Sequence, residues 1–341
     1  MSPSSIRFAS LLSLTLTALA CSSSSPAGTG GTGTGGSAGT SGTPGTGGTA
    51  GPLAYKPCDA AQRLGGFSLQ LTEAAPPAPA FTQVNGKVYD RVDPSSVWVS
   101  DSREGDCQLL LGPTIKCTAP CPGGQVCAGK DVCAPEPTSQ SVGMVTLTGL
   151  LAPLSLKPLS DTVAVYSGNL PTGTSYPPFA PEAAVTLSAT GGVQGAFTLS
   201  GRGIEPLVFA GTGLKVGAGG QPLTVTWTPS TQARSTRIEV VLEVGHHGGY
   251  AARLQCLVAD TGSTTVPGGI IAKLIAQGTA GFPTISLTRQ TVDSTSLGAG
   301  CVDFTVASFV QRDLEVENLV SCNDDHPCPS GRTCGTDQKC K

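Results

Sequence analysis

The stretch RIEVVLEV at residues 237–244 decides the fold class of this chain. Apolar side chains fall at every second position from Ile238 to Val244, and the charged side chains of Glu239 and Glu243 lie between them. Successive side chains of a β-strand point to opposite faces of the sheet. The alternation therefore predicts a strand with one buried face and one face in solvent.

Other short runs rich in Val, Ile, Thr and aromatic residues surround this stretch, separated by turns that contain Gly and Pro. Within residues 140–318 they predict one antiparallel β-sandwich domain, with Trp227 as a large core residue. The only helical pattern, PGGIIAKLIAQG at 267–278, places Ile270 and Leu274 on one side and is expected to close an end of the sandwich. The remaining strand runs are 145–150, 162–167, 184–189, 195–200, 222–228, 251–259, 284–290 and 301–310.

The composition supports an all-β chain. Charged residues make up 13% of the 341 residues, against roughly 25% in an average soluble domain. Gly (46 residues) and Pro (27 residues) are abundant, and many Thr, Ser and Val favour short strands over helices. The net charge of −3 and the lack of a basic stripe give no reason to expect a nucleic acid as partner.

The first twenty residues have the pattern of an export signal. Arg7 precedes the apolar run FASLLSLTLTALA at 8–20, which is too short to span a bilayer but has the length of a signal-peptide core. The junction before Cys21 resembles the bacterial lipoprotein signal, in which this cysteine is acylated. The resemblance implies a signal peptide at 1–20 and a membrane anchor of acyl chains on Cys21. Because the Leu and the small residue before the cysteine stand in reverse order, cleavage without lipidation is the alternative.

A flexible linker is expected after the junction, and with the cysteine it covers residues 21–52. Residues 22–52 carry no charged or aromatic side chain, so they cannot bury enough apolar surface to offset their ordering entropy. By resemblance to lipoprotein sorting, Ser22 implies the outer membrane, on its periplasmic or its cell-surface side. A small β unit over 53–116 is expected to follow the linker.

Cysteine usage indicates an oxidising compartment. Besides Cys21, twelve of the 13 cysteines remain, and all of them are expected to form disulfides in an exported chain. The pairs expected outside the cysteine clusters are Cys58 with Cys107 and Cys256 with Cys301.

The other eight cysteines form two modules, at 117–139 and 319–341, that share the pattern C-P-x-G-x-x-C-x5-C. Segments this short cannot hold a fold by core burial, so two disulfides are expected in each, with three possible connectivities. Zinc is the alternative, but five-residue gaps do not place thiolates as C-x2-C does, and His326 has no counterpart in the first module. No cofactor is predicted. The eight are Cys117, Cys121, Cys127, Cys133, Cys322, Cys328, Cys334 and Cys340.

Asp260-Thr261-Gly262-Ser263 follows an apolar strand and resembles the active-site turn of aspartic proteases. Those enzymes use two such turns, whose carboxylates share one proton. The chain has a single turn of this kind, so Asp260 would act only in a dimer. The favoured interpretation is a structural turn, in which Asp takes the first position and Gly262 supplies a positive φ.

Two further candidate sites are weaker. His246 and His247 would point to opposite faces of a strand and hold a metal only in a distorted loop, so they are interpreted as loop histidines. Four aromatic residues could form a sugar-binding platform, but aromatic residues are only 5% of the chain, so an extended platform is not expected. The aromatic candidates are Trp98, Tyr166, Tyr176 and Tyr250.

Taken together, these sequence features resemble secreted lipoproteins of Gram-negative bacteria with an acylated cysteine, a Gly/Ser/Thr tether, a β-sandwich domain and C-P-x-G-x-x-C modules. That resemblance implies a surface location and no established activity. We expect a non-enzymatic, lipid-anchored envelope protein whose β-sandwich presents a binding or structural surface to an envelope protein or a polysaccharide. The alternatives are a carbohydrate-binding surface protein and a hydrolase, acting through Asp260 in a dimer or through His246 and His247.

Overall fold

The computed structural model describes residues 55–113, 115–160, 163–171, 173–209, 211–231, 236–245 and 252–341. They belong to one compact unit. The signal peptide predicted at 1–20, Cys21 and the rest of the linker predicted at 21–52 lie outside the described residues.

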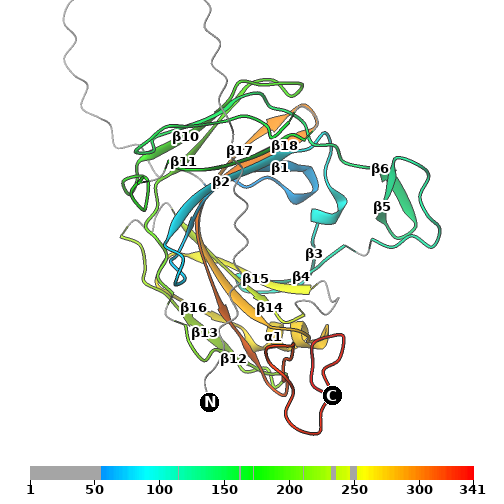
Figure 1. Cartoon of the computed structure of the whole chain (residues 1–341). Coiled ribbons are helices and arrows are strands. Elements are labelled where there is room, and N and C mark those ends of the chain that lie inside the picture. Colours follow the sequence, from blue (N-terminus) through cyan, green and yellow to red (C-terminus); the bar gives the residue numbers. More distant parts are fainter. Residues whose placement is uncertain are drawn as a thin grey trace, which may run out of the picture. The chain divides into compact units, whose positions relative to one another are not determined.

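A nine-stranded sheet forms the body of the protein (Figure 1). Neighbouring strands run antiparallel, except that β1 and β18 run parallel. The order across the sheet is β3 (Val99–Glu104), β4 (Cys107–Leu111), β15 (Ala252–Ala259), β14 (Arg237–Glu243), β17 (Thr284–Leu297), β18 (Gly300–Asp313), β1 (Arg63–Thr72), β2 (Phe81–Val88) and β9 (Val165–Asn169).

The prediction of a separate β unit at 53–116 is wrong. Its strands β1 to β4 belong to the same sheet as β14 and β18, and Figure 1 shows the N-terminal strands in blue beside the C-terminal strands in orange. The reason lies in backbone pairing: β1 finds its partner in β18, and β4 finds its partner in β15. Both partners lie far along the chain, where sequence patterns alone do not show the pairing.

The hairpin of β17 and β18, each 14 residues long, occupies the centre of the sheet. β14 pairs with Thr284–Gln290 at one end of this hairpin, and β1 pairs with Cys301–Phe309 of its other strand. The hairpin therefore joins two halves of one curved sheet (Figure 1). Each half has its own covering layer and its own core.

The half that contains β1 and β2 is covered by a four-stranded sheet of order β11–β10–β7–β8. The core between the two sheets includes the Phe67 ring, which meets the Tyr166 ring edge-on with 5.5 Å between ring centroids and lies 6.5 Å from Phe197. The covering strands are β7 (Val145–Thr148), β8 (Leu154–Leu156), β10 (Ala184–Ala189) and β11 (Phe197–Arg202).

The half that contains β14 and β15 is covered by two short strand pairs and one helix. The predicted strand at 237–244 is confirmed, since Ile238, Val240 and Leu242 are buried against this layer. Trp227 is also in the core as predicted. The covering elements are β12 (Lys215–Val216) with β19 (Glu315–Val316), β13 (Leu223–Thr226) with β16 (Ser263–Val266), and α1 (Gly268–Ala276).

The two layered halves confirm the predicted all-β sandwich class. The helix predicted at 267–278 is α1, and its nine residues contact β3, β4 and β15 at one end of the sheet. Glu104 accepts a hydrogen bond from the Ile270 backbone N–H at 2.9 Å, which satisfies one of the free donors of the helix N-terminus. Among the described residues, no helix has both the length and the apolarity to cross a membrane.

All twelve described cysteines form disulfides, as predicted, but two predicted pairs are wrong. Cys58 is bonded to Cys301, and Cys107 is bonded to Cys256. The reason is strand register: Cys107 on β4 lies directly opposite Cys256 on β15. Both modules join the first cysteine to the third and the second to the fourth. Their bonds are Cys117–Cys127, Cys121–Cys133, Cys322–Cys334 and Cys328–Cys340.

Candidate binding groove

The Asp260 carboxylate lies in the core and is fully buried. One oxygen accepts hydrogen bonds from the Trp227 indole N–H at 2.7 Å and from Arg289 Nη2 at 3.2 Å. The other accepts from Thr236 Oγ1 at 2.9 Å and from Arg289 Nε at 2.6 Å. All four donors come from other elements, so the side chain of Asp260 ties β15 to β17 and to the segment after β13.

This environment favours the ionised form of Asp260. Burial by itself would raise the pKa of the carboxyl, but the Arg289 guanidinium and the N–H and O–H donors of Trp227 and Thr236 outweigh it and lower the pKa. A protease needs a carboxylate that reaches a peptide and a water molecule. The carboxylate of Asp260 is occupied by four hydrogen bonds and has no exposed surface, so its geometry does not fit that role.

The Asp-Thr-Gly-Ser segment forms the favoured structural turn. Gly262 has a φ of +95°, and its carbonyl accepts the Trp227 backbone N–H at 2.9 Å. The Asp260 side chain differs from the expected turn role, because its hydrogen bonds reach across the core. Arg289 was missed by sequence reasoning, although it occupies a position of β17 where the alternation of Ile285 and Leu287 calls for an apolar residue.

The other predicted candidates do not form one site. His246, His247 and Tyr250 lie outside the described residues. Tyr166 is buried, and its hydroxyl donates to the Gly143 carbonyl and accepts the Val142 N–H, both at 2.9 Å. Tyr166 is therefore a core residue of the sandwich and offers no platform for a sugar. Tyr176 lines a separate hollow of about 440 Å³ beside the exposed Phe81, at the β2–β9 edge of the sheet.

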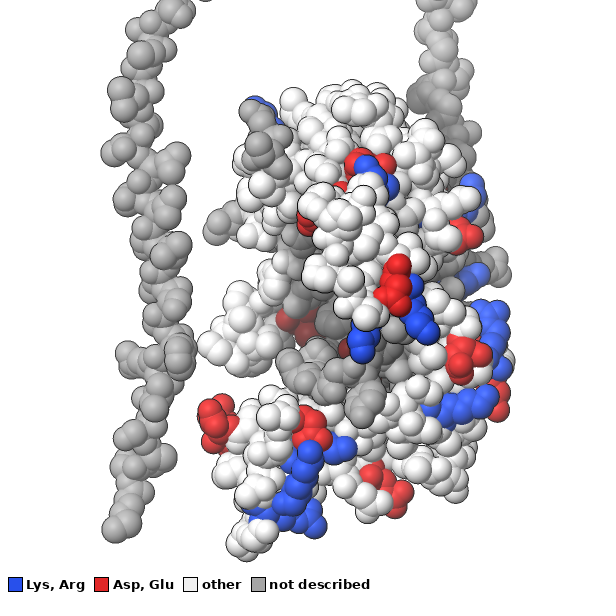
Figure 2. Space-filling view, turned by 90° about the vertical axis from the view of Figure 1, so that its right-hand side faces the viewer, with Lys and Arg blue, Asp and Glu red and all other residues white. Residues whose placement is uncertain are grey.

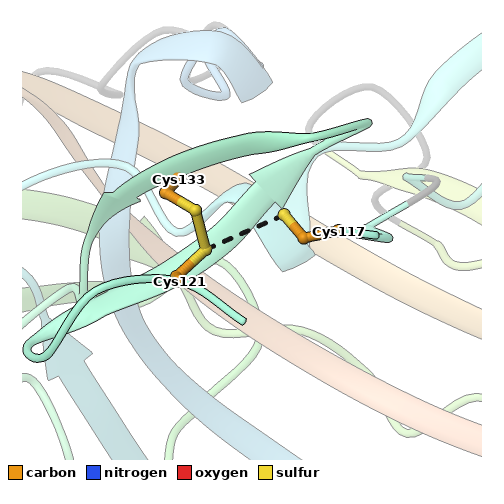
Figure 3. Close-up of side chains that lie close together, drawn as sticks. All are labelled: Cys117, Cys121 and Cys133. Carbon is orange, nitrogen blue, oxygen red and sulfur yellow. Dashed lines mark hydrogen bonds between the residues drawn. A yellow bond between two sulfur atoms is a disulfide. The ribbon is translucent and has the colours of Figure 1, made fainter. Parts of the chain in front are cut away.

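The cysteine modules bring sulfur atoms of different disulfides close together. In the first module, Cys117 Sγ lies 3.8 Å from Cys121 Sγ, and Cys121 is bonded to Cys133 in the hairpin of β5 (Gln125–Gly129) and β6 (Val132–Pro135) (Figure 3). Zinc binds thiolates, and a sulfur atom in a disulfide is not a thiolate. In the disulfide-bonded form of the structure these clusters act as covalent staples.

The face of the nine-stranded sheet opposite the two cores, named here the open face, carries polar side chains. On β14 and β15 the residues between the buried positions include Glu239, Arg253 and Gln255. On β18 and β2 they include Thr305 and Lys87. These side chains lie on one surface, because residues directly opposite each other on paired strands point to the same face of the sheet.

Three adjoining hollows line the open face and form what we name the open-face groove. The first, of about 320 Å³, includes Arg253 and shares Arg63, Asp303 and Thr305 with the second. The second, of about 530 Å³, has the backbone of three glycines in its floor and shares Lys87 and Tyr89 with the third. The third, of about 320 Å³, lies between the end of β2, η2 (Pro94–Ser96) and the first cysteine module. The glycines of the floor are Gly65, Gly66 and Gly86.

The glycine at position 86 is required by packing. A Cβ there would lie 2.1 Å from the Phe67 ring, because the two residues are paired neighbours on β1 and β2. The missing side chain of Gly86 therefore makes room for Phe67 on the core face. On the open face, β1 and β2 carry Ser68, Asn85 and Lys87.

The first hollow of the groove holds the best-defined set of polar groups. The Arg253 guanidinium lies 4.3 Å from the centre of the Trp98 ring, a cation–π contact. The buried Nε of Arg253 has no hydrogen-bond partner among the described residues. Gln255 donates its amide N–H to Glu239, and burial lowers the pKa of Arg253 while Glu239 raises it.

Tyr55 closes the same hollow and keeps its proton. Gln290 Nε2 lies 3.3 Å from the Tyr55 hydroxyl, and burial, then the charge of Glu239, raises the pKa of Tyr55 to about 12. At neutral pH the hydroxyl is therefore a donor as well as an acceptor. Beside it, Asp303 accepts the Cys58 N–H at 2.7 Å and pairs with Arg63 at 2.7 Å.

Charges of both signs alternate along the groove. The first hollow has two basic residues, Arg63 and Arg253, and two acidic residues, Glu239 and Asp303. Figure 2 shows Lys and Arg interspersed with Asp and Glu over the described surface of one side of the molecule. Over the three hollows, three basic residues face four acidic ones, so neither sign dominates; they are Arg63, Arg253 and Lys87, and Glu239, Asp303, Asp93 and Glu136.

No protein-family model matches the sequence, and no curated protein matches it. Among solved structures, the chain is similar to the FN1–FN3 domains of chicken CNTN1, with 10% sequence identity over 69% of this chain and 76% of that chain and a TM-score of 0.19. The architecture described above therefore rests on the strand order and the two cores of this chain itself.

Proposed function

We propose that this chain is a lipid-anchored protein of a bacterial cell envelope whose β-sandwich body is a non-enzymatic binding module. The observation that carries the proposal is the open-face groove, in which two hollows with charged and polar side chains flank a mainly apolar one. Polar groups that converge in a concave surface are the usual mark of a binding site. The ligand is held on the open face, and the two cores on the other face keep that surface rigid.

Export is supported by the disulfides. Six disulfides join all twelve described cysteines, and such bonds persist in oxidising compartments outside the cytoplasm. Cys21 follows the signal-like segment directly and is left as the acylation site. Two or three acyl chains on one cysteine anchor a protein stably, whereas a single chain does not.

A binding role fits the described side chains better than hydrolysis does. The one motif with catalytic character is built around Asp260, whose carboxylate is committed to Arg289 and Trp227 inside the core. In the groove, by contrast, Arg253 and Glu239 lie at the surface of a hollow and are available to a ligand. These groups are hydrogen-bond donors and acceptors and need no activated nucleophile.

The length of the proposed linker sets how far the binding module can lie from the membrane. A coil of the 31 residues 22–52 spans about 30 Å on average and about 100 Å when extended. The body can therefore stand clear of a lipid headgroup layer and meet ligands in the adjoining envelope.

The anchor is tested by Cys21→Ser in the full-length chain produced in a Gram-negative host. Wild-type protein is expected in the membrane fraction, with an N-terminal cysteine whose mass includes the acyl chains. The Cys21→Ser protein is expected in the soluble or unprocessed fraction. A wild-type N-terminus without acyl groups, or unchanged membrane association of the variant, would overturn the lipid anchor.

A further inference from the structure

We infer that the open-face groove binds a linear, uncharged polysaccharide, with Arg253, Glu239 and Tyr55 as the main contacts of one sugar unit. The inference rests on the binding role proposed above and names its ligand class. It is carried by the shape of the groove, by its mixed charges and by the Arg253 guanidinium, which lines the first hollow and packs against Trp98.

The shape of the groove fits a polymer. Its first two hollows follow the sheet from β15 to β9, which are separated by six strand spacings, or about 29 Å at ~4.8 Å per spacing. Shared lining residues make the hollows continuous, as Arg63 and Thr305 belong to both. A single small molecule would fill one hollow, whereas a chain of sugar units would occupy successive hollows.

The charge balance selects an uncharged ligand. An anionic polymer would meet Glu239 and Asp303, and a cationic one would meet Arg63 and Arg253. A hydroxyl group both donates and accepts a hydrogen bond. Neighbouring sugar hydroxyls can therefore donate to the Glu239 carboxylate and accept from the Arg253 guanidinium at the same time.

Arg253 is the strongest single contact that the groove offers. Its side chain is held against the Trp98 ring, and its Nε has no partner among the described residues. Because Nε has no accessible surface, a ligand in the hollow can accept only from the terminal nitrogens of the guanidinium. Trp98 acts on the ligand through Arg253 and is a positioning residue.

Tyr55 completes the donor set. Its hydroxyl lies in the same hollow as Arg253 and stays protonated throughout the physiological range. Donors on Arg253 and Tyr55 thus stand together with the acceptor on Glu239. This combination matches a sugar ring with several hydroxyls better than a ligand that only accepts or only donates.

An extended peptide fits the groove less well. Peptides that bind sheets usually add to an exposed strand edge through backbone hydrogen bonds. The groove crosses the face of the sheet over strands β15, β14, β17, β18, β1 and β2, whose ladders already use their backbone groups. Only side chains are left to recognise a ligand there.

The test is affinity electrophoresis of the full-length chain in detergent, through native gels that contain one polymer each. The uncharged linear probes are amylose, hydroxyethyl cellulose and laminarin. Alginate serves as the anionic probe and gelatin as the unfolded polypeptide. We expect at least one uncharged polysaccharide to retard the protein, and tryptophan fluorescence to change on titration with the same polymer.

Variants connect the retardation to the groove. Arg253→Ala is expected to weaken the apparent affinity at least about tenfold, and Arg253→Lys less, because a lysine keeps the charge but not the planar fork. Trp98→Phe is expected to retain more affinity than Trp98→Ala, since Phe keeps an aromatic face under Arg253. Arg332→Ala, an exposed arginine of the C-terminal module, is the matched control and is expected to bind as wild type.

Each other outcome overturns the inference. Retardation by gelatin alone would make an extended polypeptide the ligand, and retardation by alginate alone would make it an anionic polymer. Failure of every probe, or binding unchanged in Arg253→Ala, would remove the sugar subsite. The membrane fraction of the same wild-type preparation reports the anchor separately, so the loss of sugar binding and the loss of the lipid anchor are distinguished.

Discussion

The covered and the open face of the nine-stranded sheet use charged residues in opposite ways. On the covered face, Asp260 and Arg289 are buried and hydrogen-bonded to each other and to neighbouring groups of the core. On the open face, Glu239 and Arg253 lie in a hollow, and part of the Arg253 guanidinium has no partner among the described residues. A charge that is fully paired supports the fold, whereas a charge with spare hydrogen-bonding capacity is available to a ligand.

The largest effect is expected from breaking the pair on the covered face. Arg289→Met leaves the Asp260 carboxylate buried without its cation, and this is expected to lower the free energy of unfolding by about 3–5 kcal/mol. The double variant Asp260→Asn with Arg289→Met should lose less than the sum of the single changes, because neither residue then leaves a charge unpaired. Denaturant unfolding at pH 7 measures both values.

The pH dependence of the same pair has a definite sign. The pKa of Asp260 is lower in the folded than in the unfolded protein, so its contribution is present above the ordinary carboxyl pKa of about 3.9 and is lost as the pH falls below it. Arg91→Met, which breaks the exposed pair with Asp90, should change the free energy of unfolding far less than Arg289→Met and is the control. A loss in Arg289→Met no larger than in this control would refute the structural role of the buried pair.

An intermediate effect is expected from the long-range disulfides, one on each face. Cys58→Ala with Cys301→Ala is expected to lower the free energy of unfolding by about 2–5 kcal/mol. The bonds close loops of 243 and 149 residues, which differ by only about 0.4 kcal/mol in the chain-entropy model. Any larger loss in Cys107→Ala with Cys256→Ala therefore measures the packing of the covered face. Equal losses in the free energy of unfolding would show that the two faces tolerate the loss of the cysteine sulfurs equally well.

The smallest effect is expected at Tyr55, on the open face. Tyr55→Phe removes the hydrogen bond with Gln290 and should change stability by about 0.5–1.5 kcal/mol at neutral pH. Because the pKa of Tyr55 is raised to about 12, the folded protein favours the neutral phenol, and this contribution is lost as the pH rises from about 10 to about 12. The pKa of Tyr176 is also raised by burial, so Tyr55→Phe should lower, and not abolish, the phenolate absorbance that develops near pH 12. An unchanged absorbance would contradict the high pKa of Tyr55.

Sequence reasoning reached the fold class but not the pairing of distant strands. The alternation of β14 predicted which side chains are buried, because burial of a half-exposed strand is a local property. The disulfide between Cys107 and Cys256 depends on β4 lying beside β15, and no local pattern encodes that neighbour. For the same reason the strands within 53–116 were assigned to a unit of their own.

The candidate site was also only partly predictable. Trp98 was named for its aromatic ring alone, and nothing in its neighbourhood along the chain indicates Arg253, which lies more than 150 residues away. The polar positions of β14 and β15 can be identified from their alternation, but their assembly with Tyr55 and Asp303 requires the sheet order. Asp260 shows the converse, since a sequence motif with catalytic character serves as a buried anchor of the core.

The Cys58–Cys301 bond sets the path that mechanical tension takes through the molecule. The described chain begins at Tyr55, and Cys58 joins it covalently to β18, a central strand that is paired on both sides. A pull applied at Tyr55 is delivered through the disulfide of Cys58 to β18, in the middle of the sheet. Strand β1, which would otherwise peel away one hydrogen bond at a time, is spared that load.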